Sequence, residues 1–301
     1  MNEEPVRRHS FLHHAARRLV WPFLVVSSAA ILAFGFSLGR EVLFFNISYA
    51  WIVAWLFLLE KLLPYRAGWR LSDGQLGPDL SHTVLNKGLV QLLIVQLIGL
   101  GILGGDGTSM AGSLALPFQV AIGLVIVEIG LYSAHRLGHE WALLWRFHAV
   151  HHSSKKLWLI NTGRFHFVDS LVSVVASLPF LLLLGISTDA IVWISAITAY
   201  IGILTHCNVD MECGWLNYIF NTPNLHRWHH SADRAECDHN YAENMMLWDI
   251  LLGTFLYKKG PGIAEAGIAE KMPRKFFAQL AVPFIWNRYQ LAADPVSPDI
   301  L

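Results

Sequence analysis

The sequence predicts an all-α integral membrane protein, and three features of the chain indicate this fold class. Only 15% of the 301 residues are charged and 54% are hydrophobic, whereas about 25% of the residues in soluble domains are charged. The apolar residues are gathered in runs of about 20, the length of helix that crosses a bilayer core. The formal net charge is zero, so the composition does not indicate a nucleic-acid partner.

The apolar runs predict the helices in chain order. Four runs are long enough to span a membrane, and they cover residues 19–39, 42–62, 84–104 and 115–134. The next apolar block, 168–205, is too long for one span and is interrupted at 185–189. We therefore expect about four transmembrane helices, followed by a hairpin of two short or re-entrant helices. The histidine-rich remainder is expected to form a helical cap on the cytosolic side.

The basic residues indicate the orientation of the chain. If the N-terminus is cytoplasmic, the outer loops contain only Arg40 of the 22 lysines and arginines. Such a bias is the positive-inside pattern of multi-pass proteins. The same orientation places every histidine on the cytoplasmic side. We expect the basic N-terminus to lead into a retained helix, because no clear cleavage site follows it.

The histidines are grouped at spacings that suit metal binding. His135 and His139 are four residues apart, on one face of a helix. The pattern His-x-x-His-His then occurs twice, and it supplies His148, His151, His152, His226, His229 and His230. Imidazole is a common ligand for transition metals. Eight are too many for one tetrahedral ion and about right for two.

These stretches resemble a known family. HRLGHE at 135–140, HAVHHSS at 148–154 and HRWHHS at 226–231 are similar to the histidine boxes of the fatty acid hydroxylase/sterol desaturase superfamily. The similarity extends to NTPNLHRWHHS and to DHNYAENMMLWDILLGTF at 238–255, with some likeness to the branch that includes alkylglycerol monooxygenase. The chain departs from the family pattern at Ala242, where glycine is usual, and at Leu252, where phenylalanine is usual.

The resemblance implies a non-haem di-iron oxidoreductase. Two iron ions held by histidines would use O2 to oxidise an unactivated C–H bond of a lipid. Hydroxylation of a fatty acyl, sterol or ether lipid is expected ahead of desaturation, which the motifs do not separate from it. The sequence contains no recognisable electron-transfer domain, so electrons are expected from a partner protein or a diffusible reductant.

Two other classes of protein remain open at this stage. A metal transporter would need ligands along a route through the membrane, and a membrane zinc hydrolase would use only three or four of the histidines. The grouping of the histidines at one membrane face favours neither class.

Other residues are candidates for the same site. The family often has a histidine near His206 and another near His166, and His239 lies in CDHNYAE; we expect these three as further ligands or supporting residues. His82 stands alone and is not expected to bind metal. Five acids near the boxes are expected to orient histidines or to form caps and surface ion pairs, and they are Glu140, Asp169, Asp233, Asp238 and Asp249.

Two charged residues are candidates for a catalytic or supporting role. Glu128 lies inside a predicted span, where a charge is costly and usually functional. It shares a helical stripe with Tyr132 and His135, so we expect it to line the substrate tunnel or to hydrogen-bond a ligand. Arg164 is expected to support the site in a similar way.

The chain is expected to divide into four parts. These are a cytosolic tail (1–18), the N-terminal transmembrane helices (19–114), the catalytic domain (115–260) and an interfacial tail (261–301) that mixes basic and aromatic residues.

The three cysteines form no CxxC pair, which indicates buried or reduced thiols rather than a disulfide framework.

Overall fold

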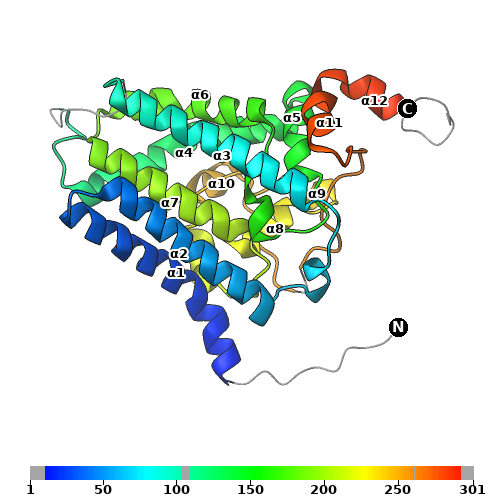
Figure 1. Ribbon diagram of the computed structural model, residues 1–301, viewed down its shortest axis with the longest axis horizontal. Coiled ribbons are helices and arrows are strands. Elements are labelled where there is room, and N and C mark those ends of the chain that lie inside the picture. Colours follow the sequence, from blue (N-terminus) through cyan, green and yellow to red (C-terminus); the bar gives the residue numbers. More distant parts are fainter. Residues whose placement is uncertain (1–10, 103–108, 261, 293–301) are drawn as a thin grey trace.

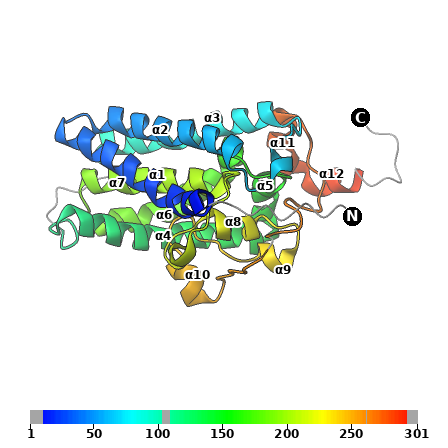
Figure 2. The ribbon, with the colours of Figure 1, turned by 90° about the horizontal axis from the view of Figure 1, so that it is seen from below.

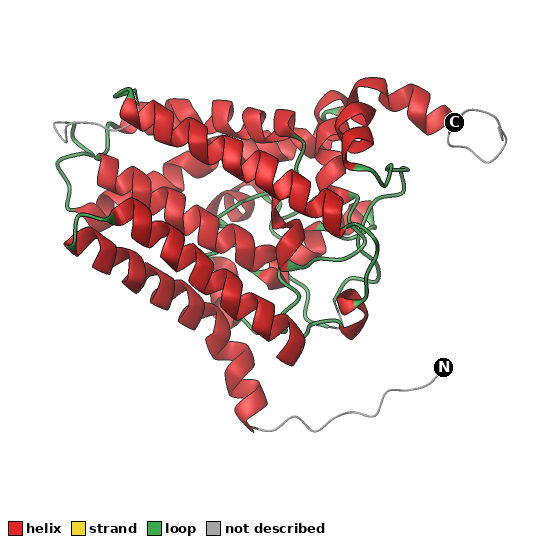
Figure 3. Ribbon diagram, viewed as in Figure 1, coloured by secondary structure: helices red, strands yellow, loops and turns green. Residues whose placement is uncertain are grey.

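The protein is a helical bundle in the computed structural model, which describes residues 11–102, 109–260 and 262–292. The described residues contain helices and turns but no strand (Figure 3). The long helices are α1 (Phe11–Ser37), α2 (Glu41–Leu62), α3 (Leu76–Gly99), α4 (Leu116–Glu140), α6 (Phe167–Leu184) and α7 (Thr188–His206). Helices satisfy their own backbone hydrogen bonds, which an apolar environment requires. The predicted all-α class is confirmed.

The remaining elements are short. They are η1 (Ala67–Arg70), α5 (Ala142–His152), η2 (Leu159–Gly163), η3 (Gly214–Tyr218), α8 (Pro223–His229), α9 (Arg234–Cys237), α10 (Leu247–Leu252), α11 (Phe276–Ala281), η4 (Val282–Ile285) and α12 (Trp286–Ala292). The α1–α2 and α6–α7 turns lie at one end of the bundle, while α5, α8 and α9 gather at the opposite end (Figures 1 and 2). The histidine boxes therefore lie together at one end of the long helices.

Five of the described helices are long and apolar enough to cross a membrane, namely α1, α2, α4, α6 and α7. The chain is a multi-pass membrane protein. Many large apolar side chains on these helices are exposed, as expected for surfaces that face lipid; Phe34, Val42, Phe57, Val175 and Leu183 are examples.

The third predicted span, 84–104, corresponds to a helix with other bounds and a more polar sequence than expected. Run 84–104 lies largely on α3, which begins eight residues earlier, at Leu76, and ends at Gly99. Helix α3 is not among the five candidate spans, because polar residues such as Asp79, His82 and Asn86 interrupt its apolar sequence. Residues 103 and 104 lie outside the described part of the chain.

The predicted hairpin is present, but its helices are longer than expected. Helices α6 and α7 contain 18 and 19 residues, or about 27 Å of helix each at 1.5 Å per residue. Gly185 ends α6 in the left-handed conformation at φ +56°, and the Ser187 hydroxyl caps α7 by accepting from the Ala190 N–H. The break expected at 185–189 therefore falls at 185–187.

Two apolar cores hold the long helices together. One joins α1, α2 and α7 through buried residues that include Leu24, Leu56 and Leu204. The other joins α4, α6 and α7 through residues that include Leu124 and Ile194. Helix α7 contributes to both cores, so it connects the N-terminal helix pair to the helices that carry the histidines.

The C-terminal elements project from the bundle (Figure 1). Phe277, Phe284 and Leu291 in α11, η4 and α12 are exposed, which fits the expected interfacial tail. Residues 1–10 of the predicted N-terminal tail and 293–301 of the C-terminal tail lie outside the described residues.

Candidate metal centre

Nine buried histidines form two groups at the end of the bundle. In each group, one nitrogen of every ring lies within 4.8 Å of those of the other members. The first group consists of His135, His139, His148, His152 and His229, and the second of His151, His206, His226 and His230. The eight box histidines and His206, all predicted ligands, are thus brought together.

Each His-x-x-His-His box contributes to both groups. His148 and His152 belong to the first group, but His151 belongs to the second. Residues four apart lie about 40° apart around a helix, whereas adjacent residues lie about 100° apart. The last pair of each box therefore points in two directions. In α8 and its C-cap, His226 and His230 join the second group and His229 joins the first.

Four of the five histidines of the first group have their Nδ1 atoms held by oxygen acceptors. The Nδ1 of His135 lies 2.6 Å from the Tyr241 carbonyl oxygen, and that of His148 lies 3.0 Å from Asp169 Oδ2. The Nδ1 of His139 lies 3.1 Å from Asp238 Oδ1, and that of His229 lies 2.8 Å from the His239 carbonyl oxygen. Nδ1 then carries the hydrogen, and Nε2 keeps its lone pair for a metal.

The opposite nitrogens of these rings point into the group. The Nε2 atoms of His135 and His229 are buried and have no hydrogen-bond partner. The Nε2 of His152 lies 3.1 Å from that of His139 and 3.0 Å from that of His148. Unpartnered polar atoms in a protein interior are costly, so this donor set fits a metal ion.

Two of the four histidines of the second group are held in a similar way. The Nδ1 of His151 lies 3.2 Å from the Arg164 carbonyl oxygen, and that of His206 lies 3.3 Å from Asn161 Oδ1. The Asn161 amide nitrogen donates to the Ser154 hydroxyl and the Lys156 carbonyl, which fixes the amide oxygen toward His206. Asn161 was not a candidate from the sequence, because nothing in its local sequence distinguishes it from a turn residue.

Five of the grouped histidines that lie outside the membrane-spanning helices are neutral at neutral pH. Burial lowers the pKa well below 6.5 for these five: His151, His152, His226, His229 and His230. The neighbouring imidazoles lower the pKa further. Neutral imidazole is the form that binds metals.

The two groups adjoin each other and open onto one cavity. The rings of His152 and His230 stack with their centroids 4.4 Å apart. The cavity has a volume of about 80 Å³ and is lined by His135 and His148 of the first group and by His151, His206 and His226 of the second. A molecule in this cavity would contact both groups.

Many of the other residues that line the cavity are polar. Helices α6 and α7 contribute small hydroxyl side chains and one glycine, namely Ser173, Thr198, Gly202 and Thr205. Asp169 and Glu243 supply carboxylates. Asp169 was a candidate from the sequence, but the hydroxyl residues and Glu243 were not, although hydroxyl residues within an apolar run were a signal that could have indicated the former.

Glu128 occupies a different place from the one expected. Its fully buried carboxylate accepts the backbone N–H groups of Glu243, Asn244 and Met245, at 2.6, 3.0 and 3.2 Å. Among the described residues it does not line the cavity, and its carboxylate forms no hydrogen bond with a histidine. Glu128 holds the turn that carries Glu243 to the cavity wall, so it acts on the site through the backbone.

The buried Arg164 side chain connects the start of α3 to the end of α5. Its guanidinium donates to Asp79 at 2.6 Å and to Gln75 at 3.2 Å, both near the start of α3. It also donates to the Val150 carbonyl and the Ser153 hydroxyl, at the end of α5. The side chain does not line the cavity, but its carbonyl oxygen orients His151.

Two further predicted ligands lie outside the groups. The His166 Nδ1 accepts the Val168 N–H at the start of α6, and Nε2 lies 3.1 Å from the Leu280 carbonyl oxygen. Both nitrogens are therefore engaged, which leaves none for a metal. His239 is half-buried and contributes its carbonyl oxygen to orient His229.

The five candidate acids have different roles. Asp169 and Asp238 orient His148 and His139, as proposed for some of them from the sequence. Asp249 instead accepts the backbone N–H groups of Tyr241 and Ala242. Glu140 pairs with Arg136, and Asp233 caps α9.

All three cysteines are buried and free, as the sequence predicted. The Cys237 sulfur lies 3.8 Å from His152 Nδ1 and 3.9 Å from His139 Nδ1. Burial raises the pKa of this thiol to about 12, so Cys237 packs against the first group as a neutral thiol.

Comparison with known proteins agrees with this arrangement. The model of the family described as fatty acid hydroxylase matches residues 120–254, which include all nine histidines of the two groups. The ornithine lipid hydroxylase OlsE of Rhizobium tropici is 44% identical over 284 residues, covering 91% of this chain and 86% of the relative.

More distant relatives share a smaller part of the chain. Alkylglycerol monooxygenase of Danio rerio is 30% identical over 185 residues, which cover 58% of this chain and 40% of the relative. The human alkylglycerol monooxygenase is 33% identical over 129 residues, or 43% of this chain and 28% of the relative. No solved structure matches the chain. The chain belongs to the fatty acid hydroxylase family and is an oxidoreductase, a lipid hydroxylase or monooxygenase.

Proposed function

We propose that the two histidine groups each hold one iron ion and that the protein uses O2 to hydroxylate an amino-acid-containing lipid of the ornithine lipid type. The observation that carries the proposal is the shared cavity, onto which both groups open. A two-metal site beside one cavity suits the activation of O2 next to a substrate C–H bond. The bound iron would supply the oxidising chemistry.

The polar cavity lining and the similarity to OlsE support this substrate class. The cavity combines apolar surface with hydroxyl groups and with the carboxylates of Asp169 and Glu243, which suits a lipid that carries a polar head group. Carboxylates would attract the cationic amine of an amino lipid. The polar part of the lipid is therefore the part that fits beside the histidines.

The protein residues bind, orient and exclude water in this proposal. His135, His139, His148, His152 and His229 would hold one ion, and His151, His206, His226 and His230 the other. Glu128 and Arg164 would act as positioning residues, and His166 and His239 would be supporting residues rather than ligands.

The reaction needs an electron source outside the chain. One atom of O2 would enter the C–H bond as a hydroxyl group, and the other would leave as water after the donor supplies two electrons and two protons are taken up. The donor is proposed to be a separate electron-transfer protein or a diffusible reductant, which reaches the site from the cytoplasm.

The proposed orientation places the histidine end of the bundle in the cytoplasm. Arg40 lies in the α1–α2 turn, at the end of the bundle opposite the histidines (Figure 1). The charge asymmetry of the sequence supports this orientation. We also propose that residues 115–260 act as the catalytic domain and that α11–α12 lies along the membrane interface.

The direct test is a lipid assay in a bacterium that makes ornithine lipids. Expression of this chain under ¹⁸O₂ should add one labelled oxygen atom to these lipids, as measured by mass spectrometry. The His148→Ala variant should add none. Fragmentation of the product would show which part of the lipid carries the oxygen.

Other results would point to other functions. Loss of two hydrogens without labelled oxygen would indicate a desaturase. Unchanged ornithine lipids, together with oxidation of an ether lipid, a sterol or a free fatty acid, would contradict the proposed substrate class while keeping the reaction type.

A further inference from the structure

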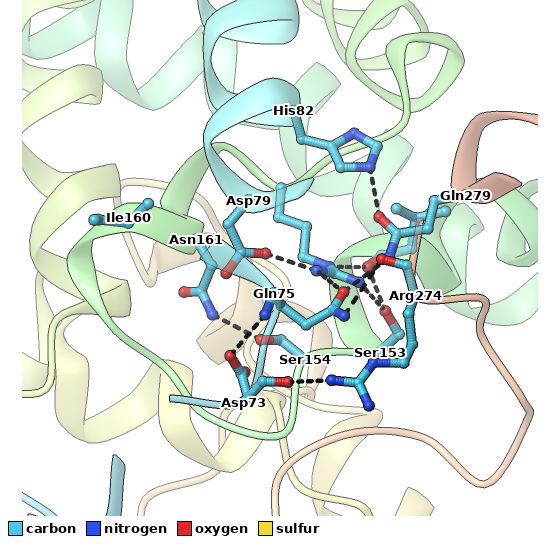
Figure 4. A network of polar contacts seen from close by, with 12 residues as sticks. Asp73, Gln75, Asp79, His82, Ser153, Ser154, Ile160, Asn161, Arg274 and Gln279 are labelled. Carbon is cyan, nitrogen blue, oxygen red and sulfur yellow. Dashed lines mark hydrogen bonds and ion pairs between the residues drawn. The ribbon is translucent and has the colours of Figure 1, made fainter. Parts of the chain in front are cut away.

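A buried polar network connects the C-terminal helix α11 to the second histidine group. It includes His82, which looked isolated in the sequence and is fully buried in the structure. Figure 4 shows this side chain of α3 facing Gln279 of α11, with Gln75 and Asp79 close by. None of these residues is a candidate ligand, so the network needs a separate explanation.

Gln279 is the part of the network contributed by α11. Its side chain is fully buried, and its amide nitrogen donates to Gln75 Oε1 at 3.0 Å and to the Pro273 carbonyl oxygen at 2.8 Å. These two acceptors fix the orientation of the amide. The amide oxygen therefore faces His82 Nε2, 3.0 Å away.

His82 transmits this contact to the segment of Arg164, Phe165 and His166, called here the 164–166 segment. The Nδ1 of His82 lies 3.0 Å from the Phe165 carbonyl oxygen, which also accepts from the Asn86 amide. Both nitrogens of His82 face acceptors, so at least one of these contacts is a hydrogen bond donated by the ring.

Each residue of the 164–166 segment is tied to α3 or α11. The Arg164 guanidinium donates to Asp79 and to Gln75, whose side-chain oxygen it shares with Gln279. The His166 Nε2 lies 3.1 Å from the Leu280 carbonyl oxygen in α11. The segment is thus held from two sides by elements that supply no histidine to either group.

The 164–166 segment in turn fixes His151. The Arg164 carbonyl oxygen lies 3.2 Å from His151 Nδ1. The Phe165 ring stacks on the His151 ring, with centroids 3.9 Å apart and an interplanar angle of 14°. One contact sets the tautomer of His151 and the other sets the plane of its ring.

We propose that His82 and Gln279 are positioning residues, which clamp the 164–166 segment and thereby hold His151 in the geometry that the second metal requires. The proposal rests on the two-iron site proposed above. It gives α11 a role in the metal centre, although α11 supplies no ligand. Outer contacts of this kind typically change metal affinity by about 10- to 100-fold.

The test compares Gln279→Met and His82→Phe with the unsubstituted protein, all loaded with ⁵⁷Fe in detergent. Both changes preserve approximate side-chain volume and remove the polar contacts. Iron at the second group should be bound about 10- to 100-fold more weakly. Its Mössbauer component should change or disappear while the component of the first group persists.

Gln290→Met is the matched control. Gln290 belongs to α12 in the same C-terminal region, and its amide bonds only to the backbone of Lys271 among the described residues. It should leave iron content and spectrum unchanged. Helicity and gel filtration show whether Gln279→Met and His82→Phe fold. If one of them does not fold, the iron affinity and spectrum of the other test the proposal.

Two distinguishable outcomes would contradict the proposed positioning role of His82 and Gln279. If the unsubstituted protein binds two irons and both variants keep the same affinity and spectrum, His82 and Gln279 do not position His151. The proposed two-iron site is unaffected by that result. If the unsubstituted protein binds no iron, the two-iron site itself is wrong, and the positioning role that rests on it is wrong as well.

Discussion

At the scale of single residues, the site depends on acceptors as much as on histidines. The local spacing of the boxes predicted eight of the nine grouped histidines, because residues four apart share a helix face whatever the fold. Their orienting partners come from distant segments, such as Asp169 for His148 and Tyr241 for His135. Such pairings depend on tertiary packing, which a single sequence does not reveal.

The Asp169→Asn substitution tests this dependence. An amide in place of the carboxylate weakens the acceptor for His148 Nδ1, so metal affinity of the first group should fall by about 10- to 100-fold. Equilibrium dialysis against iron measures the change. Asp189→Asn, an exposed position at the far end of α7, is the control and should bind as the unsubstituted protein does. Equal affinity in both variants would refute the role of Asp169.

Glu128→Gln tests the positioning role of the buried carboxylate. The new amide group would face backbone N–H donors at residues 243–245, so the free energy of unfolding should fall by about 1–3 kcal/mol. Turnover should also fall, while iron content is retained, because the carboxylate holds the cavity wall rather than a metal. Denaturant unfolding and the lipid assay measure the two effects.

The exposed Glu265 offers a matched control. Glu265→Gln should change neither stability nor turnover. Loss of iron from Glu128→Gln would show that Glu128 acts on the ligands, contrary to its placement.

At the scale of elements, apolar length predicted the helices better than it predicted their roles. The α6–α7 hairpin was expected to be short or re-entrant because its apolar block had one visible break, yet each arm is long enough to cross a membrane. Helix α3 shows the opposite case. Its polar residues lower its hydropathy, and the structure uses Asp79 and His82 for buried contacts with Arg164 and Gln279.

The contact between α4 and α6 gives a test at this scale. A Cβ atom added to Gly130 would lie 2.3 Å from the Ala176 carbonyl oxygen and 2.5 Å from Ser177 Cα. The helix backbones approach too closely for alanine, so Gly130→Ala should lower the free energy of unfolding by about 1–3 kcal/mol. Denaturant unfolding in detergent measures the loss.

Gly88 provides the control for this substitution. It lies within α3, and an added Cβ would meet no atom within 4 Å. Gly88→Ala should be neutral or slightly stabilising, because alanine favours helix. Equal stability of Gly130→Ala and Gly88→Ala would contradict the close contact.

At the scale of the whole molecule, the bundle gathers imidazoles from α4, α5, α7 and α8 at one end. The sequence indicated this end from charge and box positions. It did not indicate that each box would be divided between two groups, because that division depends on how α5 and α8 face one another.

The buried histidines should make the metal-free protein sensitive to acid. Their pKa values are lowered in the folded state, so below about pH 6.5 the unfolded state takes up protons that the folded state does not. The free energy of unfolding should fall as the pH falls, by about 1.4 kcal/mol per pH unit for each such histidine. Denaturant unfolding at pH 7.5 and 5.5 measures the difference, and equal stability would contradict neutral burial.

The central claim is that the two histidine groups hold two irons, and the metal content of the purified protein tests it most directly. Elemental analysis with Mössbauer spectroscopy should find about two irons per chain with an exchange-coupled signal. His148→Ala and His229→Ala should each remove most of the bound metal. Stoichiometric zinc without iron after growth in iron-replete medium, or full metal retention in both variants, would contradict the account.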